Sequence, residues 1–246
     1  MATNSVNDAS RRRLAFALDY PTLEDARAGA AKVAPYLGVL KVGLELFVRE
    51  GPAAARLPNE LGCDAFLDLK LHDIPETVDR AVASACQVGV RYLTLHTSGG
   101  PRMMEQAAKR VQLENVPLTL LGVTVLTSLD QADLNAIGVT AAPGEHALKL
   151  ALLARSSGLT GCVCSVAEVA RLRNALGPDF VLVTPGIRFS GAGGDDQKRV
   201  GRPRDAIAAG ASILVVGRPI RDASDPEQVA AAIVHEIADA AATHQI

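Results

Sequence analysis

One segment of the chain, FLDLKLHDIPET, places charged side chains at a spacing that could support chemistry. In an extended strand, a separation of two residues puts Asp68 and Lys70 on one face and the neighbouring leucines on the other. Asp73 follows in the next turn. The dipeptide Ile74-Pro75 then favours the end of the extended segment and the start of a helix with proline in its first position.

Alternating ammonium and carboxylate groups suit a site that handles an anion whose charge moves during the reaction. Lys41, in an earlier apolar run, is expected to bring a further cation to the same rim. The structural alternative for Asp68 and Lys70 is a buried ion pair followed by a helix cap. We favour the catalytic interpretation, because paired charges are costly to desolvate and hydrophobic residues often replace them without loss.

A second pair of motifs, VTPGIR and VVGRPI, ends two late apolar runs with glycine and arginine. Glycine lets backbone N–H groups approach an oxyanion, and arginine adds a bidentate charge-assisted contact. In (β/α)8 enzymes, the loops after the last two strands commonly bind phosphate. Arg188 and Arg218 are therefore expected to bind a phosphorylated substrate. The alternative for either motif alone is an exposed arginine that caps a helix.

The elements that must position these residues alternate along the chain. Eight short apolar runs are predicted strands: residues 14 to 19, 39 to 44, 65 to 71, 92 to 98, 118 to 126, 161 to 165, 180 to 186 and 212 to 218. Helix-like segments lie between them. Strict alternation implies parallel crossovers, so 246 residues favour an α/β fold, a single-domain (β/α)8 TIM barrel. The alternative is an open doubly wound sheet, but no G-x-G-x-x-G follows the first strand.

We expect the barrel to occupy residues 14 to 246, after a flexible polar lead-in at residues 1 to 13. A Gly-rich stretch at about residues 188 to 203 is too long for a simple connection. Its position within the chain favours a lid, and its glycines permit the backbone changes of closure.

The composition excludes several kinds of partner. The formal net charge is -2 and no basic cluster exceeds Arg11 to Arg13, so no nucleic acid is expected. No apolar run reaches the roughly 18 residues that span a bilayer, and the polar start lacks a signal peptide, so we expect no membrane association and a cytoplasmic location. The four cysteines lack Cys-x-x-Cys spacing and no metal-ligand pattern stands out, which favours reduced thiols and no metal.

An ordered set of motifs closely resembles the bacterial orotidine 5'-phosphate decarboxylase family. The motifs are FALD at 16 to 19, KVGLELF at 41 to 47, DLKLHDIPET at 68 to 77, TVLTS at 124 to 128, TPGIRF at 184 to 189, GDDQKR at 194 to 199 and VVGRPI at 215 to 220. The similarity runs from residue 14 to about 235. FALD departs from the more aliphatic strand expected, which alters packing but leaves Asp19 in place.

The resemblance implies a carboxy-lyase without a cofactor, which converts orotidine 5'-phosphate to uridine monophosphate (UMP) and carbon dioxide in the last step of de novo UMP biosynthesis. The implied catalytic residues are Lys41, Asp68, Lys70 and Asp73. The implied substrate-binding residues are Asp19, Lys41, Ile74, Thr77, Thr127, Ser128, Pro185, Arg188, Gln197, Gly217 and Arg218, with Gln197 in the lid. The resemblance also implies a homodimer in which Asp73 and Thr77 reach the partner's site.

The chemistry of the residues agrees with these roles. Loss of carbon dioxide leaves electron density at C6 of the pyrimidine, without an adjacent carbonyl to absorb it. The ammonium of Lys70 can stabilise that charge and then deliver the proton that completes UMP. Asp68 would face the departing carboxylate, and either ground-state destabilisation or positioning of Lys70 would explain its presence.

Two other functions fit the same barrel. A metal-dependent sugar-phosphate decarboxylase or aldolase-like enzyme would share the Asp-x-Lys-x-x-Asp strand, but we would expect a carboxylate in place of Lys41. A barrel that only binds a phosphorylated ligand would have little reason to retain alternating Lys and Asp charges.

Overall fold

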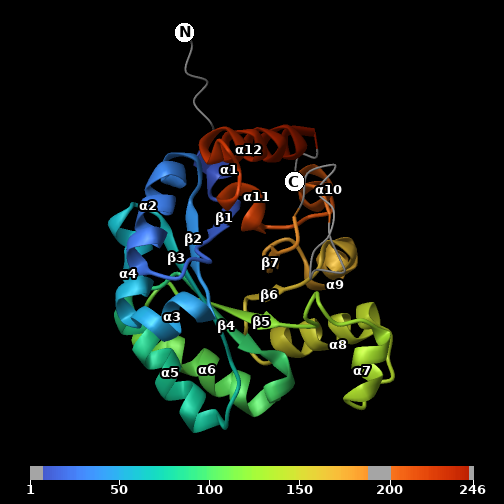
Figure 1. The fold of residues 1–246 in the computed structure, drawn as a ribbon. Helices are drawn as coiled ribbons and strands as arrows, with labels where there is room; N and C mark the ends of the chain where they lie inside the picture. The colour runs from blue at the N-terminus through green and yellow to red at the C-terminus, as the bar shows by residue number, and fades with distance from the viewer. Residues whose placement is uncertain (1–7, 188–200, 244–246) are drawn as a thin grey trace.

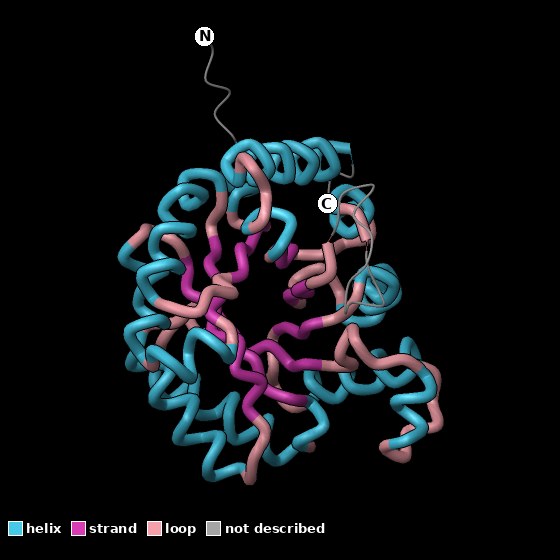
Figure 2. The backbone as a smooth tube through the Cα atoms, in the orientation of Figure 1, coloured by secondary structure: helices cyan, strands magenta, loops and turns pink. Residues whose placement is uncertain are grey.

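The structure, a computed structural model, describes residues 8–187 and 201–243. Within these residues, eight parallel strands close into a barrel in sequence order. They are β1 (Leu14–Ala17), β2 (Val39–Val42), β3 (Asp64–Leu71), β4 (Tyr92–His96), β5 (Thr119–Val123), β6 (Gly161–Val163), β7 (Val181–Thr184) and β8 (Ile213–Val216). Figure 2 shows the strands as an inner ring with the helices around it. The predicted (β/α)8 barrel is confirmed.

The helices lie on the outside of the barrel, where α2 to α10 are in the connections between successive strands (Figure 1). They are α1 (Asp8–Arg11), α2 (Leu23–Val33), α3 (Leu44–Glu50), α4 (Pro52–Glu60), α5 (Pro75–Val88), α6 (Pro101–Glu114), α7 (Gln131–Ala136), α8 (Pro143–Ser156), α9 (Val169–Leu176), α10 (Pro203–Ala208), α11 (Arg218–Arg221) and α12 (Pro226–Thr243). Short 3-10 turns lie at Ala34–Tyr36, Thr97–Gly99 and Val166–Glu168. Six of these helices begin with proline, whose fixed φ and missing N–H suit the first helical position.

Two apolar layers hold the barrel together. Alternate residues of each strand point inward or toward the helices, so Ala15, Ala17, Phe66 and Val183 pack inside the barrel. The opposite faces pack against the helices in a larger core that includes Leu14 and Phe16. The strands are thus buried on both faces, which explains why they stand out in the sequence as continuous apolar runs.

The start of the described chain packs on the barrel. Arg11 Nη2 donates to the backbone oxygen of Ala34 at 3.3 Å, and Arg13 Nη2 donates to that of Ala211 at 2.6 Å. Helix α1 contacts α12 near the other end of the chain (Figure 1). Residues 8 to 13, the described part of the expected lead-in, are therefore packed rather than free.

Most of the expected lid, residues 188 to 200, lies outside the described residues. The described residues on either side of this segment are close together, because the N–H of Gly201 donates to the backbone oxygen of Gly186 at 3.1 Å. No helix in the described part of the chain is long and apolar enough to cross a membrane.

Candidate active site

A cavity of about 220 Å3 opens inside the barrel, at the carboxyl ends of its strands. Its lining comes from strands or strand ends all around the barrel except β4: Ala17, Asp19, Lys41, Phe66, Asp68, Lys70, Val123, Val125, Leu126, Thr127, Val163, Cys164, Val183, Pro185, Gly186, Val215, Gly217 and Arg218. Eight residues predicted from the sequence, Asp19, Lys41, Asp68, Lys70, Thr127, Pro185, Gly217 and Arg218, are among them. The barrel therefore gathers these predicted residues, from Asp19 near the start of the chain to Arg218 near its end, into one cavity.

Four charged side chains form a linked row on one wall of the cavity. Lys41 Nζ lies 3.7 Å from Asp19 Oδ1 and 3.6 Å from Asp68 Oδ2. Lys70 Nζ donates to both carboxylate oxygens of Asp68, each at 3.0 Å. Lys41 and Asp68 are almost buried, with side chains 11% and 15% exposed. Two ammonium groups thus share one buried carboxylate.

This arrangement keeps Asp68 ionised. Burial by itself would raise the pKa of Asp68, because a buried carboxylate loses its hydration. The positive charges of Lys41 and Lys70, together with hydrogen bonds from Lys70 and Thr94, outweigh burial and hold the pKa below its ordinary value. The cavity therefore presents a fixed negative charge between two fixed positive charges.

The strand that carries Asp68 and Lys70 is irregular between them. Leu67 pairs with Leu93 and Leu71 pairs with Leu95, so four steps along β3 match only two along β4. Lys70 lies in this bulge with φ of +50°, in the left-handed region that residues other than glycine rarely adopt. Both charged side chains line the cavity, as their spacing predicts. The bulge itself was not predicted.

The opposite part of the cavity combines glycine with arginine. Pro185 and Gly186 follow β7, and Gly217 and Arg218 follow β8. A side chain at Gly217 would bring its Cβ within 3.3 Å of Asp19 Oδ2, so glycine permits a close approach of the two strand ends. Arg188 and Gln197, the other residues expected to contact phosphate, lie outside the described residues.

Four predicted residues are absent from the described lining of the cavity. Asp73, Ile74, Thr77 and Ser128 are exposed on this single chain, and Ile74 is 66% exposed. The carboxylate of Asp73 accepts the N–H of Ile74 at 2.6 Å. The segment after β3 therefore points its functional candidates to the surface rather than into its own cavity.

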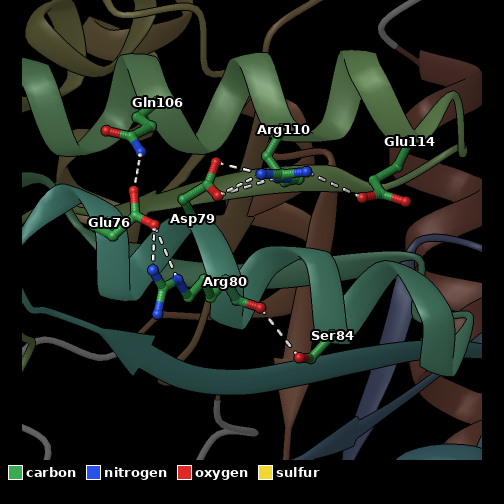
Figure 3. Close-up of polar contacts among 7 residues, drawn as sticks. All are labelled: Glu76, Asp79, Arg80, Ser84, Gln106, Arg110 and Glu114. Carbon is green, nitrogen blue, oxygen red and sulfur yellow. Dashed lines mark hydrogen bonds and ion pairs between the residues drawn. The ribbon is translucent and has the colours of Figure 1, made fainter.

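Helix α5, which begins directly after that segment, is fixed to α6 by polar contacts (Figure 3). Arg110 Nη2 on α6 donates to Asp79 Oδ2 at 2.6 Å, and Asp79 is buried. Nearer the start of α5, Glu76 accepts from Gln106 at 3.2 Å and from Arg80 at 2.7 Å. These contacts hold the first turns of α5, and hence the exposed residues beside them.

Sequence reasoning missed Thr94, which is fully buried in β4. Its hydroxyl lies 2.9 Å from Asp68 Oδ1 and 2.9 Å from the backbone nitrogen of Lys70. The available signal was a single polar residue inside the apolar run YLTLH. That signal does not say which neighbour the hydroxyl reaches.

Two histidines lie at the edge of the charged row. The rings of His72 and His96 have centroids 5.4 Å apart. Burial, and then the nearby His72 and Lys70, lower the pKa of His96 below its ordinary value, against a small opposite effect of Asp68. His96 is therefore neutral at neutral pH.

Fold and cavity together define a (β/α)8 barrel protein with a charged site at the carboxyl ends of its strands. The sequence model of the "Orotidine 5'-phosphate decarboxylase / HUMPS family" matches residues 12–233. This match covers most of the chain, which therefore belongs to that family.

Individual relatives agree with the family match. The orotidine 5'-phosphate decarboxylase of Anaeromyxobacter sp. (strain K) is 50% identical over 221 residues, which cover 90% of this chain and 96% of that protein. The enzyme of Trichlorobacter lovleyi is 46% identical, covering 94% and 97%. The crystal structure of orotidine 5'-phosphate decarboxylase from Lactobacillus acidophilus superposes with a TM-score of 0.80 at 35% identity, over 92% of this chain and 99% of that one.

Proposed function

We propose that this chain converts orotidine 5'-phosphate to UMP and carbon dioxide. The observation that carries the proposal is the position of Lys70, whose ammonium enters the cavity beside Asp68 and Lys41. The bond from C6 of the pyrimidine to its carboxylate breaks, its electron pair stays on C6, and carbon dioxide leaves. The Lys70 ammonium stabilises that charge, donates its proton to C6 and regains a proton from solvent.

The role of Asp68 follows from its hydrogen bonds. Both of its oxygens bind the Lys70 ammonium, which supports a positioning role. Its lowered pKa also keeps a negative charge near the departing carboxylate. Lys41 would bind the ribose together with Asp19 and would balance the two carboxylates.

The phosphate would occupy the glycine and arginine part of the cavity. Arg218 and the backbone of Gly217 would bind it, next to Pro185. From the family resemblance, we further assign Arg188 and Gln197 to the phosphate and Thr127 with Ser128 to the pyrimidine. Binding energy from the phosphate can then organise the charged row at the other end, so a substrate without phosphate should lose kcat as well as affinity.

We also propose a homodimer in which Asp73 and Thr77 complete the partner's site. Both are exposed and absent from the described lining of their own cavity. Ile74, between them in sequence, is 66% exposed, and Leu44 and Val48 on α3 are 50% and 79% exposed. These apolar side chains follow the carboxyl ends of neighbouring strands, β2 and β3, so they can form one continuous contact surface.

We propose a cytoplasmic location from the state of the cysteines. All four, Cys63, Cys86, Cys162 and Cys164, are buried and unpaired thiols. Unpaired thiols are usual in a reducing compartment.

The residue at position 41 in β2 argues against a metal-dependent enzyme. That enzyme would be expected to place a carboxylate where Lys41 lies, and the ammonium here approaches two carboxylates within 3.7 Å. An ammonium at this place would repel a divalent cation. The description of the matched family names both orotidine 5'-phosphate decarboxylase and HUMPS, so an activity assay is the test that separates the two alternatives.

The direct test is decarboxylation of orotidine 5'-phosphate by the purified protein. Carbon dioxide release and UMP formation are measured together, with Lys70→Ala as the inactive control. Turnover by the wild type and none by the variant is expected. Equal rates for the two proteins, or no product from the wild type, would reject the proposal.

A further inference from the structure

We propose that Thr94 is a positioning residue that sets the place of Lys70 and Asp68 in the reaction. The proposal rests on the function proposed above for these two residues. Thr94 is absent from the described lining of the cavity, so it is expected to act through them and not on the substrate.

The directions of the hydrogen bonds at Thr94 are fixed by chemistry. The backbone N–H of Lys70 can only donate, so the Thr94 hydroxyl accepts it at 2.9 Å. The hydroxyl has a single proton, and that proton is donated to Asp68 Oδ1 at 2.9 Å. Asp68 in turn accepts from Lys70 Nζ at 3.0 Å. The three groups form a closed ring in which both the backbone and the side chain of Lys70 are held.

The backbone bond satisfies a group that the bulge removes from the strand ladder. Between the Leu67 and Leu71 pairings, β3 and β4 lose their regular register. A buried N–H without a partner is destabilising, and the Thr94 hydroxyl supplies that partner for Lys70. The left-handed conformation of Lys70 is itself unfavourable for a residue with a Cβ. Such a conformation persists only where its surroundings hold it.

Thr94 is itself rigidly placed. It lies in the middle of β4, with zero exposed surface. Thr94 pairs with Leu121 of β5, and the register between β4 and β5 is regular at this position. The regular strand β4 therefore carries the hydroxyl that holds the irregular part of β3 in place.

Removal of the hydroxyl should affect turnover more than binding. The ammonium of Lys70 must meet C6, and misplacement by about 1 Å can reduce a rate about 100-fold. Ribose and phosphate contacts involve other residues. We therefore expect Thr94→Val, which keeps the shape, to lower kcat by roughly 10- to 100-fold while KM and UMP affinity change by less than about threefold.

The same variant should shift a pH profile. Asp68 loses one hydrogen-bond donor in Thr94→Val, so its carboxylate becomes easier to protonate. The acidic limb of kcat/KM against pH should move to higher pH. Loss of packing alone would not move that limb.

Thr94→Ser and Thr97→Val are the matched comparisons. Serine retains the hydroxyl and should restore most of kcat. Thr97 is also fully buried just after β4, but its hydroxyl donates to the backbone oxygen of Val123 at 2.7 Å, away from the charged row. Thr97→Val should therefore lower the Tm to a similar extent and leave kcat within about twofold, since both variants remove one buried hydrogen bond.

The experiment measures kcat, KM, UMP affinity and Tm for the wild type and the three variants, and it includes crystal structures of the wild type and Thr94→Val. A low kcat with near-normal UMP affinity only in Thr94→Val, rescue in Thr94→Ser, and a displaced Lys70 support the proposal. Wild-type kcat in folded Thr94→Val, equal losses in Thr97→Val, or no rescue by serine overturns it. If the wild type does not decarboxylate orotidine 5'-phosphate, the proposed function fails separately. Thr94 is then judged by whether Lys70 keeps its conformation in Thr94→Val.

Discussion

Arg221 Nη1 donates to the backbone oxygen of Asp19 at 2.9 Å, across 202 positions of sequence. Arg221 ends α11, the short helix that begins with Arg218. Asp19 follows β1 and lies 3.7 Å from Lys41 Nζ. This bond therefore joins the part of the cavity expected to bind phosphate to the charged row, across the seam between β1 and β8.

Substitution of the two arginines of α11 should have different effects on substrates with and without phosphate. Arg218→Ala is expected to lower kcat/KM for orotidine 5'-phosphate roughly 10- to 100-fold, the loss of a hydrogen bond to a charged group. It should change the much slower reaction of orotidine, which lacks phosphate, by less than about threefold. Arg221→Ala is the control, because it releases Asp19 and should slow both substrates by similar factors. Equal losses for both substrates in Arg218→Ala would place this arginine outside the phosphate site.

Lys70 combines a proposed chemical role with a left-handed backbone, and two substitutions distinguish the effects of the two. Lys70→Ala and Lys70→Gly should both lower kcat by at least about 10,000-fold, since each removes the stabilising charge and the proton donor. Glycine adopts φ of +50° without strain, so Lys70→Gly should be more stable than Lys70→Ala by about 1 kcal/mol. Turnover and urea unfolding measure the two effects. Near-normal turnover in either variant contradicts the mechanism, and an alanine variant as stable as the glycine variant contradicts the strain.

If Asp73 completes the active site of the partner subunit, two inactive variants should restore activity when their subunits are mixed. Lys70→Ala and Asp73→Ala homodimers should each be inactive. In a mixed dimer, one site collects both substitutions and the other has neither. With random pairing, half of the dimers are mixed and each has one intact site of two, so roughly a quarter of wild-type activity should return. Verified mixed dimers without activity would assign Asp73 to the site of its own subunit.

Metal removal should leave the reaction unchanged. In the proposed mechanism, Lys41 and Lys70 supply the positive charge at the reacting centre, and their ammonium groups lie 3.6 Å and 3.0 Å from Asp68. Dialysis against EDTA, followed by assay with and without added magnesium, should give equal kcat values. Loss of turnover that magnesium restores would favour the metal-dependent alternative.

His96 should titrate below the ordinary pKa of histidine. Burial and the nearby His72 and Lys70 disfavour its protonated form in the folded protein. The unfolded chain therefore binds the extra proton first, and the protein should lose stability as pH falls below about 6.5. NMR titration of the ring measures the pKa, and urea unfolding of His96→Asn should show a weaker pH dependence over the same range. A His96 that titrates at or above 6.5 would contradict the expected environment.

The barrel could be predicted from the sequence because parallel strands that are buried on both faces appear as continuous apolar runs. Each predicted run overlaps one strand, although β3 begins one residue before its run, and the spacing of Asp68 and Lys70 correctly predicted that both face the cavity. The bulge could not be predicted in this way. The backbone N–H of Lys70, in its left-handed conformation, donates to Thr94, which is 24 positions away and belongs to another strand. Nor can one chain supply the surroundings of Asp73, if these belong to a second copy.

Closure of the barrel also has a consequence for synthesis of the chain. The first strand to emerge, β1, pairs with the last, β8, through Leu14 with Leu214 and its neighbours. Until β8 has been made, both β1 and β7 have an unpaired edge, and exposed strand edges favour association between chains. The nascent protein thus passes through an open, incomplete sheet that no local contact can close. We therefore expect the yield of folded protein to depend on how long that open sheet persists during synthesis, as well as on the stability of the finished barrel.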